Sequence, residues 1–169
     1  MVSMRKTLTR VLTTLLLLAA LEASASSLPE TRNPAEILKV SNSKLTVVNV
    51  WATWCIPCVA EMDDLRGVDA HFRDADVRLV GVSLDDVLPG ERSATKAKVK
   101  TFLAARRVTY RNVYYTGKLA ALEDFLRFEG GIPITIIFDR AGKELARTQG
   151  IVTKAGLIRQ LEQLLKRSR

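Results

Sequence analysis

The sequence contains only two cysteines, Cys55 and Cys58, and two residues separate them. A cysteine attacks a disulfide as the thiolate, so a redox-active cysteine needs surroundings that lower its pKa. The start of a helix provides them, because its unpaired amides and its dipole favour negative charge. The spacing places Cys58 one helical turn after Cys55, where it can attack a mixed disulfide formed there. The pair therefore predicts thiol-disulfide exchange, with Cys55 as the nucleophile and Cys58 as the resolving thiol.

Two other roles for the cysteine pair are weaker. A structural disulfide that closes so short a loop would constrain the unfolded chain very little. A tetrahedral zinc site needs two further ligands, and the sole histidine, His71, supplies only one. His71 lies beside Asp69 and Asp74 in a polar stretch, which is typical of a solvated surface histidine. We therefore expect no metal site, and no cofactor other than the Cys55-Cys58 disulfide itself.

The segments on either side of the cysteines predict a strand and a helix that position them. Leu45–Trp51 is a nearly continuous β-branched run, typical of a central strand buried on both faces. From Cys58 to Phe72 the apolar residues recur at helical intervals, which predicts an amphipathic helix that begins near Cys55. Pro57 fits the first turn of this helix, where the N–H that proline lacks has no partner to lose.

The rest of the chain alternates between helix and strand patterns. Helices are predicted over residues 33–40, 92–107, 119–128 and 151–165, and extended segments over residues 77–84, 108–115, 134–138 and 143–148. A turn is predicted at residues 139–142, so that the last two strands form an antiparallel hairpin. Strands and helices that alternate and then end in a hairpin predict an α/β fold with a mixed sheet.

The first 25 residues have the pattern of a secretory signal peptide. Arg5, Lys6 and Arg10 form a basic region, residues 11–21 form an apolar run, and residues 23–25 (ASA) match a cleavage site. The apolar run is shorter than the roughly 20 residues that a membrane-spanning helix needs. We expect cleavage of this segment, with a retained membrane anchor as the alternative.

The chain after the signal peptide divides into two parts. Residues 26–33 lack apolar periodicity and are expected to form a flexible leader, and residues 34–169 are expected to form one domain. The formal net charge is +8. Because an exported protein meets lipid and protein surfaces, we expect a periplasmic or otherwise extracytoplasmic location and no nucleic-acid partner. Residues 92–111 contain seven basic residues and no acidic one, and they are expected to form a solvated surface or a docking site for an acidic partner or anionic lipid.

Three motifs carry a resemblance to known proteins. Residues 47–58 (VVNVWATWCIPC), followed by Glu61, resemble the active-site strand, loop and helix of thioredoxin-like proteins. Residues 81–85 (GVSLD) resemble the next strand, and residues 130–135 (GGIPIT) resemble the cis-proline loop. The match is closest to the exported TlpA-like branch and spans residues 45–165. It implies a thioredoxin-like three-layer sandwich, with a central mixed sheet of about four to five strands flanked by helices.

The resemblance also implies roles for residues around the cysteines. Pro133 would be cis and face the cysteines, and Ile132 would offer backbone groups to an extended substrate. Trp54 would cover the disulfide. Glu61 stands where related reductases often hold an acid close to the cysteines, and it would assist proton transfer to the resolving thiol. The alternative for Glu61 is a solvated glutamate, and Asn49 stands where cytoplasmic thioredoxins have a buried aspartate.

The sequence departs from this branch in two places. Asp63 replaces the usual proline within the active-site helix. The chain between the expected mature start and the first predicted strand is also shorter than the branch's usual N-terminal hairpin requires. The second departure indicates one strand fewer at that edge of the sheet.

The function implied by the resemblance is reduction of disulfides in other exported proteins, a class that includes reductases of cytochrome c maturation. A membrane-embedded thiol reductase would return electrons to the cysteines, and the protein would act as a monomer on protein substrates. The uncharged, donor-free side chains of Ile56 and Pro57 favour this direction weakly. The alternatives are an oxidase that introduces disulfides and a non-catalytic module that binds a metal or a partner.

Overall fold

The computed structural model describes residues 28–39, 43–73, 76–87, 95–129 and 131–167. The predicted signal peptide lies outside these residues. Within the described ranges, no helix is both long enough and apolar enough to cross a membrane.

A mixed six-stranded sheet forms the centre of the fold, with the strand order β1-β4-β3-β2-β5-β6. The strands are β1 (Glu30–Thr31), β2 (Leu45–Trp51), β3 (Val77–Ser83), β4 (Arg111–Tyr115), β5 (Ile134–Asp139) and β6 (Glu144–Gln149). Strands β1 to β4 are parallel where they pair, whereas β5 runs antiparallel to β2 and β6 antiparallel to β5. The predicted mixed sheet and terminal hairpin are confirmed.

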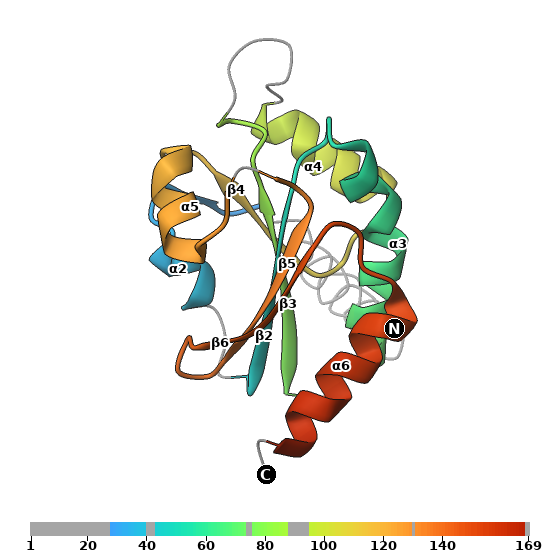
Figure 1. Ribbon diagram of the computed structural model, residues 1–169. Helices are drawn as coiled ribbons and strands as arrows, with labels where there is room; N and C mark the ends of the chain where they lie inside the picture. The colour runs from blue at the N-terminus through green and yellow to red at the C-terminus, as the bar shows by residue number, and fades with distance from the viewer. Residues whose placement is uncertain (1–27, 40–42, 74–75, 88–94, 130, 168–169) are drawn as a thin grey trace, which may run out of the picture.

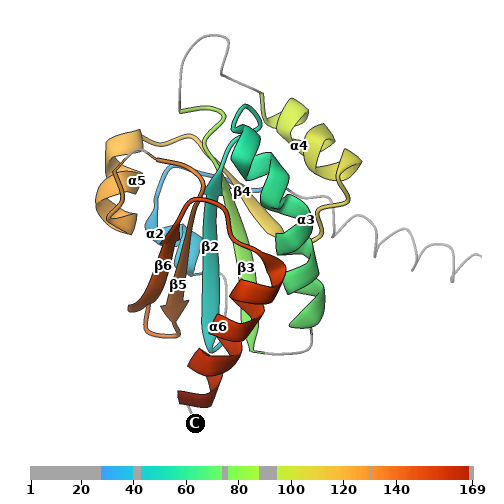
Figure 2. The same ribbon diagram turned by 45° about the vertical axis from the view of Figure 1, so that its right-hand side comes forward.

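Helices cover both faces of the sheet, which gives the predicted three-layer sandwich (Figure 1). Helices α3 (Ile56–His71), α4 (Lys96–Ala105) and α6 (Lys154–Arg167) lie on one side, and α2 (Ala35–Leu38) and α5 (Leu119–Leu126) lie on the other. Figure 2 shows the same division after rotation. Helix α3 continues without interruption through Asp63, the position where the related branch has proline.

Strand β2 is buried on both faces, as its β-branched sequence predicts. Leu45 and Val47 belong to a core cluster that also contains residues of α3 and α6. Val48 and Val50 belong to a second cluster, which includes Leu122 of α5. Successive side chains of a strand point to opposite faces. The strand that leads into the cysteines is therefore fixed by packing on both sides.

The number of strands and the state of the leader differ from expectation. The sheet has six strands instead of four to five, because residues of the expected flexible leader form the edge strand β1. Leu28 is only 6% exposed, and the carbonyl groups of Pro29 and Thr31 accept hydrogen bonds from Tyr114 N and Thr116 N. The segment covers what would otherwise be the open edge of β4. A strand of two residues carries no periodicity that the sequence could reveal.

Candidate active site

The two cysteines form a disulfide at the beginning of α3. Cys55 is the N-cap residue of the helix, and its Sγ accepts a hydrogen bond from Cys58 N at 3.3 Å. Pro57 occupies the first turn, as predicted. Ile56, which separates the two cysteines in sequence together with Pro57, is 83% exposed, whereas Cys55 is 5% and Cys58 only 1% exposed. In the reduced protein, a thiolate on Cys55 would lie at the positive end of the helix dipole.

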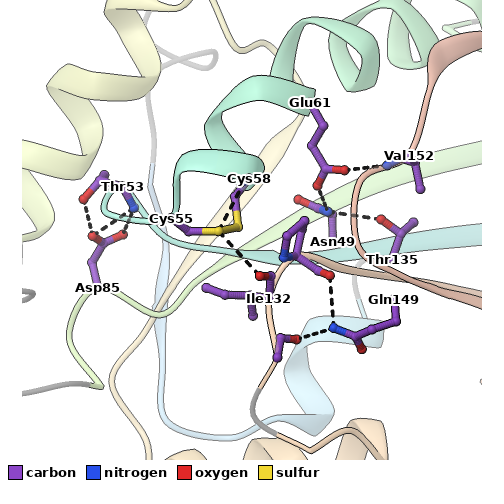
Figure 3. Close-up of a disulfide and its surroundings, with 12 residues drawn as sticks. Asn49, Thr53, Cys55, Cys58, Glu61, Asp85, Ile132, Thr135, Gln149 and Val152 are labelled. Atoms are coloured by element: carbon purple, nitrogen blue, oxygen red, sulfur yellow. Dashed lines mark hydrogen bonds between the residues drawn. A yellow bond between two sulfur atoms is a disulfide. The ribbon is translucent and has the colours of Figure 1, made fainter.

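The loop before β5 lies against the disulfide (Figure 3). The Ile132-Pro133 peptide bond is cis, as the resemblance implies. Cys55 Sγ lies 3.7 Å from the carbonyl oxygen of Ile132. Residues 132 and 133 are remote from the cysteines in sequence, and the pairing of β5 with β2 brings them to the disulfide.

Glu61 is fully buried, so the alternative of a solvated glutamate is wrong. Its carboxylate accepts hydrogen bonds from Asn49 Nδ2 and Val152 N, both at 2.8 Å. Asn49 also donates to Thr135 Oγ1 at 3.1 Å. Glu61 follows Cys58 by three positions, which puts both side chains on the same face of α3. The Glu61 carboxylate is therefore held in one orientation, one turn after the cysteines at the beginning of α3 (Figure 3).

Burial raises the pKa of the Glu61 carboxyl above its ordinary value. The hydrogen bonds from Val152 and Asn49 act in the opposite direction, and the negative charge of Asp64 raises the pKa further. Desolvation dominates because it disfavours the charged form of a buried carboxyl. A carboxyl with a raised pKa is a stronger base when ionised and a better proton carrier near neutral pH.

The two tryptophans near the cysteines occupy different environments. Trp51 is fully buried, stacks on Phe102 with ring centroids 5.9 Å apart, and donates from Nε1 to Asn112 Oδ1 at 2.9 Å. Trp51 is therefore a packing residue of the core. Trp54 is partly buried and packs against the core cluster that contains Cys55 and Cys58.

Asp85 is a residue of the site that the sequence did not identify. It is fully buried and accepts hydrogen bonds from Thr53 N at 3.2 Å, from the Thr53 hydroxyl, and from Ser83 Oγ at 2.7 Å. Asp85 therefore anchors the loop between β2 and α3 (Figure 3). Its position two residues after β3 was the available signal, because the carboxyl ends of neighbouring parallel strands meet at one edge.

A second residue that the sequence did not identify is Gln149, at the end of β6. Its side-chain amide donates to the carbonyl groups of Gly131 and Pro133. His71, by contrast, lies at the far end of α3, where it is half-exposed and 3.5 Å from a carboxylate oxygen of Glu162. Among the described residues, no three His, Cys, Asp or Glu side chains gather closely enough to hold a metal ion.

Comparisons with known proteins agree with this fold. The chain is 45% identical over 42 residues to the thiol-disulfide oxidoreductase ResA of Oceanobacillus iheyensis, an alignment that covers 25% of this chain and 22% of ResA. It is 27% identical over 125 residues to the thiol:disulfide interchange protein HelX of Rhodobacter capsulatus, covering 73% of this chain and 62% of HelX. The chain thus spans less than two thirds of the length of these curated relatives.

A solved structure gives the same result for the fold. The crystal structure of a thioredoxin-related protein from Neisseria meningitidis serogroup B matches with a TM-score of 0.62 and 25% identity, covering 78% of this chain and 91% of that one. The thioredoxin-like fold expected from the sequence is therefore confirmed. The profile of the AhpC/TSA family matches residues 22–163, and the chain belongs to that family.

Proposed function

We propose that this protein is a thiol-disulfide oxidoreductase that cycles between a Cys55-Cys58 dithiol and the observed disulfide. The observation that carries the proposal is the disulfide at the start of α3, in contact with the loop that holds the cis Ile132-Pro133 bond. The names of the relatives ResA and HelX support the same class of reaction.

The reaction runs in two exchange steps. The Cys55 thiolate attacks one sulfur of a client disulfide, which forms a mixed disulfide and releases the first client thiolate. The Cys58 thiolate then attacks Cys55 Sγ, which closes the protein's own disulfide and releases the second client thiolate. The client gains two electrons and, on protonation, two protons. A dithiol donor must afterwards reduce the Cys55-Cys58 disulfide, and we assign this task to a membrane thiol reductase.

Glu61 is proposed to accept the proton of the Cys58 thiol before the second step. The burial of Cys58 hinders direct proton loss to water. Glu61 lies on the same face of α3 and is fixed by its hydrogen bonds from Asn49 and Val152. Its raised pKa suits it to take the proton and later return it.

The client is proposed to bind across the surface around Cys55. Trp54, Ile132 and Pro133 would contact it, with the backbone of Ile132 as the hydrogen-bonding element. We propose disulfides of other exported proteins as clients, including those of cytochrome c maturation, and an extracytoplasmic monomer that uses no cofactor. The signal-peptide pattern of residues 1–25 and the resemblance to the TlpA-like branch support these assignments.

Two measurements test the proposal and its direction. Reduced wild-type protein should reduce insulin, and Cys55→Ser should lose this activity, whereas retained activity would contradict the proposed nucleophile. The reduction potential should lie near the value typical of thioredoxin, about −270 mV, whereas a value of about −120 mV would identify an oxidase.

A further inference from the structure

Gln149, the last residue of β6, makes an unusual pair of contacts with the loop beside the disulfide. Its Nε2 donates to the carbonyl oxygen of Gly131 at 2.9 Å and to that of Pro133 at 3.4 Å. The backbone N–H of Gly150 also donates to Pro133 O at 2.9 Å. One side-chain amide thus holds the residues before and after Ile132 (Figure 3).

The remaining carbonyl group of this stretch has a different environment. Ile132 O is not turned toward Gln149 but lies 3.7 Å from Cys55 Sγ. Holding the two flanking carbonyl groups on β6 therefore fixes the direction of the one between them. The backbone of Ile132 is presented on the side of the nucleophilic sulfur.

Gly131 leaves room for the side-chain amide of Gln149 because it has no Cβ atom. A Cβ atom placed on Gly131 would lie 2.8 Å from Gln149 Nε2, closer than carbon and nitrogen can approach without displacement. The absence of a side chain lets the amide reach the backbone. The hydrogen bond between Gln149 and the Gly131 carbonyl group therefore depends on both residues. The side chain of Gln149 is exposed to solvent.

We propose that Gln149 is a positioning residue that preorganises the backbone of Ile132 to bind an extended polypeptide segment of the client. The inference rests on the proposed function and specifies its substrate class. An extended peptide that pairs with a fixed backbone gains main-chain hydrogen bonds. Preorganisation lowers the entropic cost of forming them. A small disulfide without a peptide backbone gains nothing from this arrangement.

The test compares two substrates in single-turnover reactions with pre-reduced protein. The first is an uncharged peptide dimer joined by one disulfide, and the second is hydroxyethyl disulfide, which lacks a peptide backbone. Oxidation of the protein is followed at increasing substrate concentration, which separates half-saturation from the maximal rate. Gln149→Glu replaces the donor with a carboxylate oxygen that faces two carbonyl oxygens. Gln149→Ala removes the contact without adding charge.

For Gln149→Glu we expect about a tenfold loss of efficiency toward the peptide, carried by a higher half-saturation concentration. For Gln149→Ala the loss should be about threefold, since no repulsion replaces the hydrogen bonds. Efficiency toward hydroxyethyl disulfide should change by less than about twofold in both variants, because that substrate makes no backbone pairing. Gln163→Glu, an exposed position on α6 with the same charge change, is the matched control and should behave as wild type.

Three outcomes would overturn the inference. If wild type is active and both Gln149 variants reduce the peptide as well as wild type does, Gln149 does not position the binding edge. If both substrates slow equally, Gln149 acts on the reactivity of Cys55 or on the fold in general. A wild-type protein that is inert toward both substrates would contradict the proposed function, and the binding role with it. Thermal unfolding of each variant establishes that it is folded, and Gln149→Ala carries the test alone if Gln149→Glu does not fold.

Discussion

At the scale of single residues, Glu61 combines complete burial with hydrogen bonds from two N–H donors. If it removes the Cys58 proton, the loss should appear in the second exchange step and not in the first. We expect Glu61→Gln to slow resolution of the mixed disulfide by about 100-fold, because an amide cannot accept the proton. Rapid acid quenching followed by mass spectrometry would measure how long the mixed disulfide persists.

The control for this prediction is Asp63→Asn. Asp63 is an exposed carboxylate on the same helix, so the variant makes the same charge change away from the site. It should resolve the mixed disulfide at the wild-type rate. Equal resolution rates in wild type and Glu61→Gln would remove Glu61 from the proton-transfer step.

The raised pKa of Glu61 also predicts how stability depends on pH. Glu61 holds its proton more tightly in the folded protein than in the unfolded chain, where the pKa of its carboxyl is near 4.5. Its contribution is therefore fully present below that pH and is lost as the pH rises through the folded pKa. Wild type should lose free energy of unfolding relative to Glu61→Gln over the pH range that begins near 4.5 and extends upward through the folded pKa. Urea unfolding across this range would check it, and parallel curves for the two proteins would contradict it.

At the scale of elements, the loop between β2 and α3 is held by Asp85 at the end of β3. The Asp85 carboxylate accepts from Thr53 N, the Thr53 hydroxyl and Ser83 Oγ, and Leu84 N donates to Trp51 O at 2.9 Å. The loop that delivers Cys55 is thus tied to the neighbouring strand. Strand β2 leads into helix α3, and the hydrogen bonds of Asp85 hold the loop between them in one conformation.

Asp85→Asn should destabilise the protein by about 1–3 kcal/mol, because one carboxylate oxygen becomes an N–H donor that faces other donors. Urea unfolding would measure the loss. Asp86→Asn is the matched control: Asp86 is exposed, and its carboxylate accepts from Tyr114 Oη at 3.1 Å. It should cost less than about 1 kcal/mol. Equal losses in the two variants would show that Asp85 does not anchor the loop in the way described.

At the scale of the whole molecule, the sequence predicted those helices and strands that have a local pattern of apolar or turn residues. The β-branched run at residues 45–51, the helix that begins at Cys55 and the final hairpin all occur where periodicity and turn residues placed them. The edge strand β1 was missed because two residues give no periodicity. Its pairing partner, β4, also lies far away in the sequence.

The site was predictable in proportion to how local each part is. Cys55 and Cys58 are close in sequence, so their pairing followed from spacing alone. The cis bond before Pro133 followed from family resemblance and not from any local pattern. The burial of Glu61 required knowing that Val152, 91 residues away, would donate to it. Gln149 joins the site only through the pairing of β6 with β5.

The central claim is that Cys55 attacks the client and Cys58 resolves the intermediate. It is tested most directly by incubating reduced Cys58→Ala and Cys55→Ala with a disulfide-linked peptide and weighing the products under non-reducing conditions. The account predicts a stable one-to-one adduct on Cys55 in Cys58→Ala, and little adduct in Cys55→Ala, where the remaining sulfur is buried. Wild type should release the reduced peptide and form its own disulfide. An adduct that forms preferentially on Cys58 in Cys55→Ala would contradict the account.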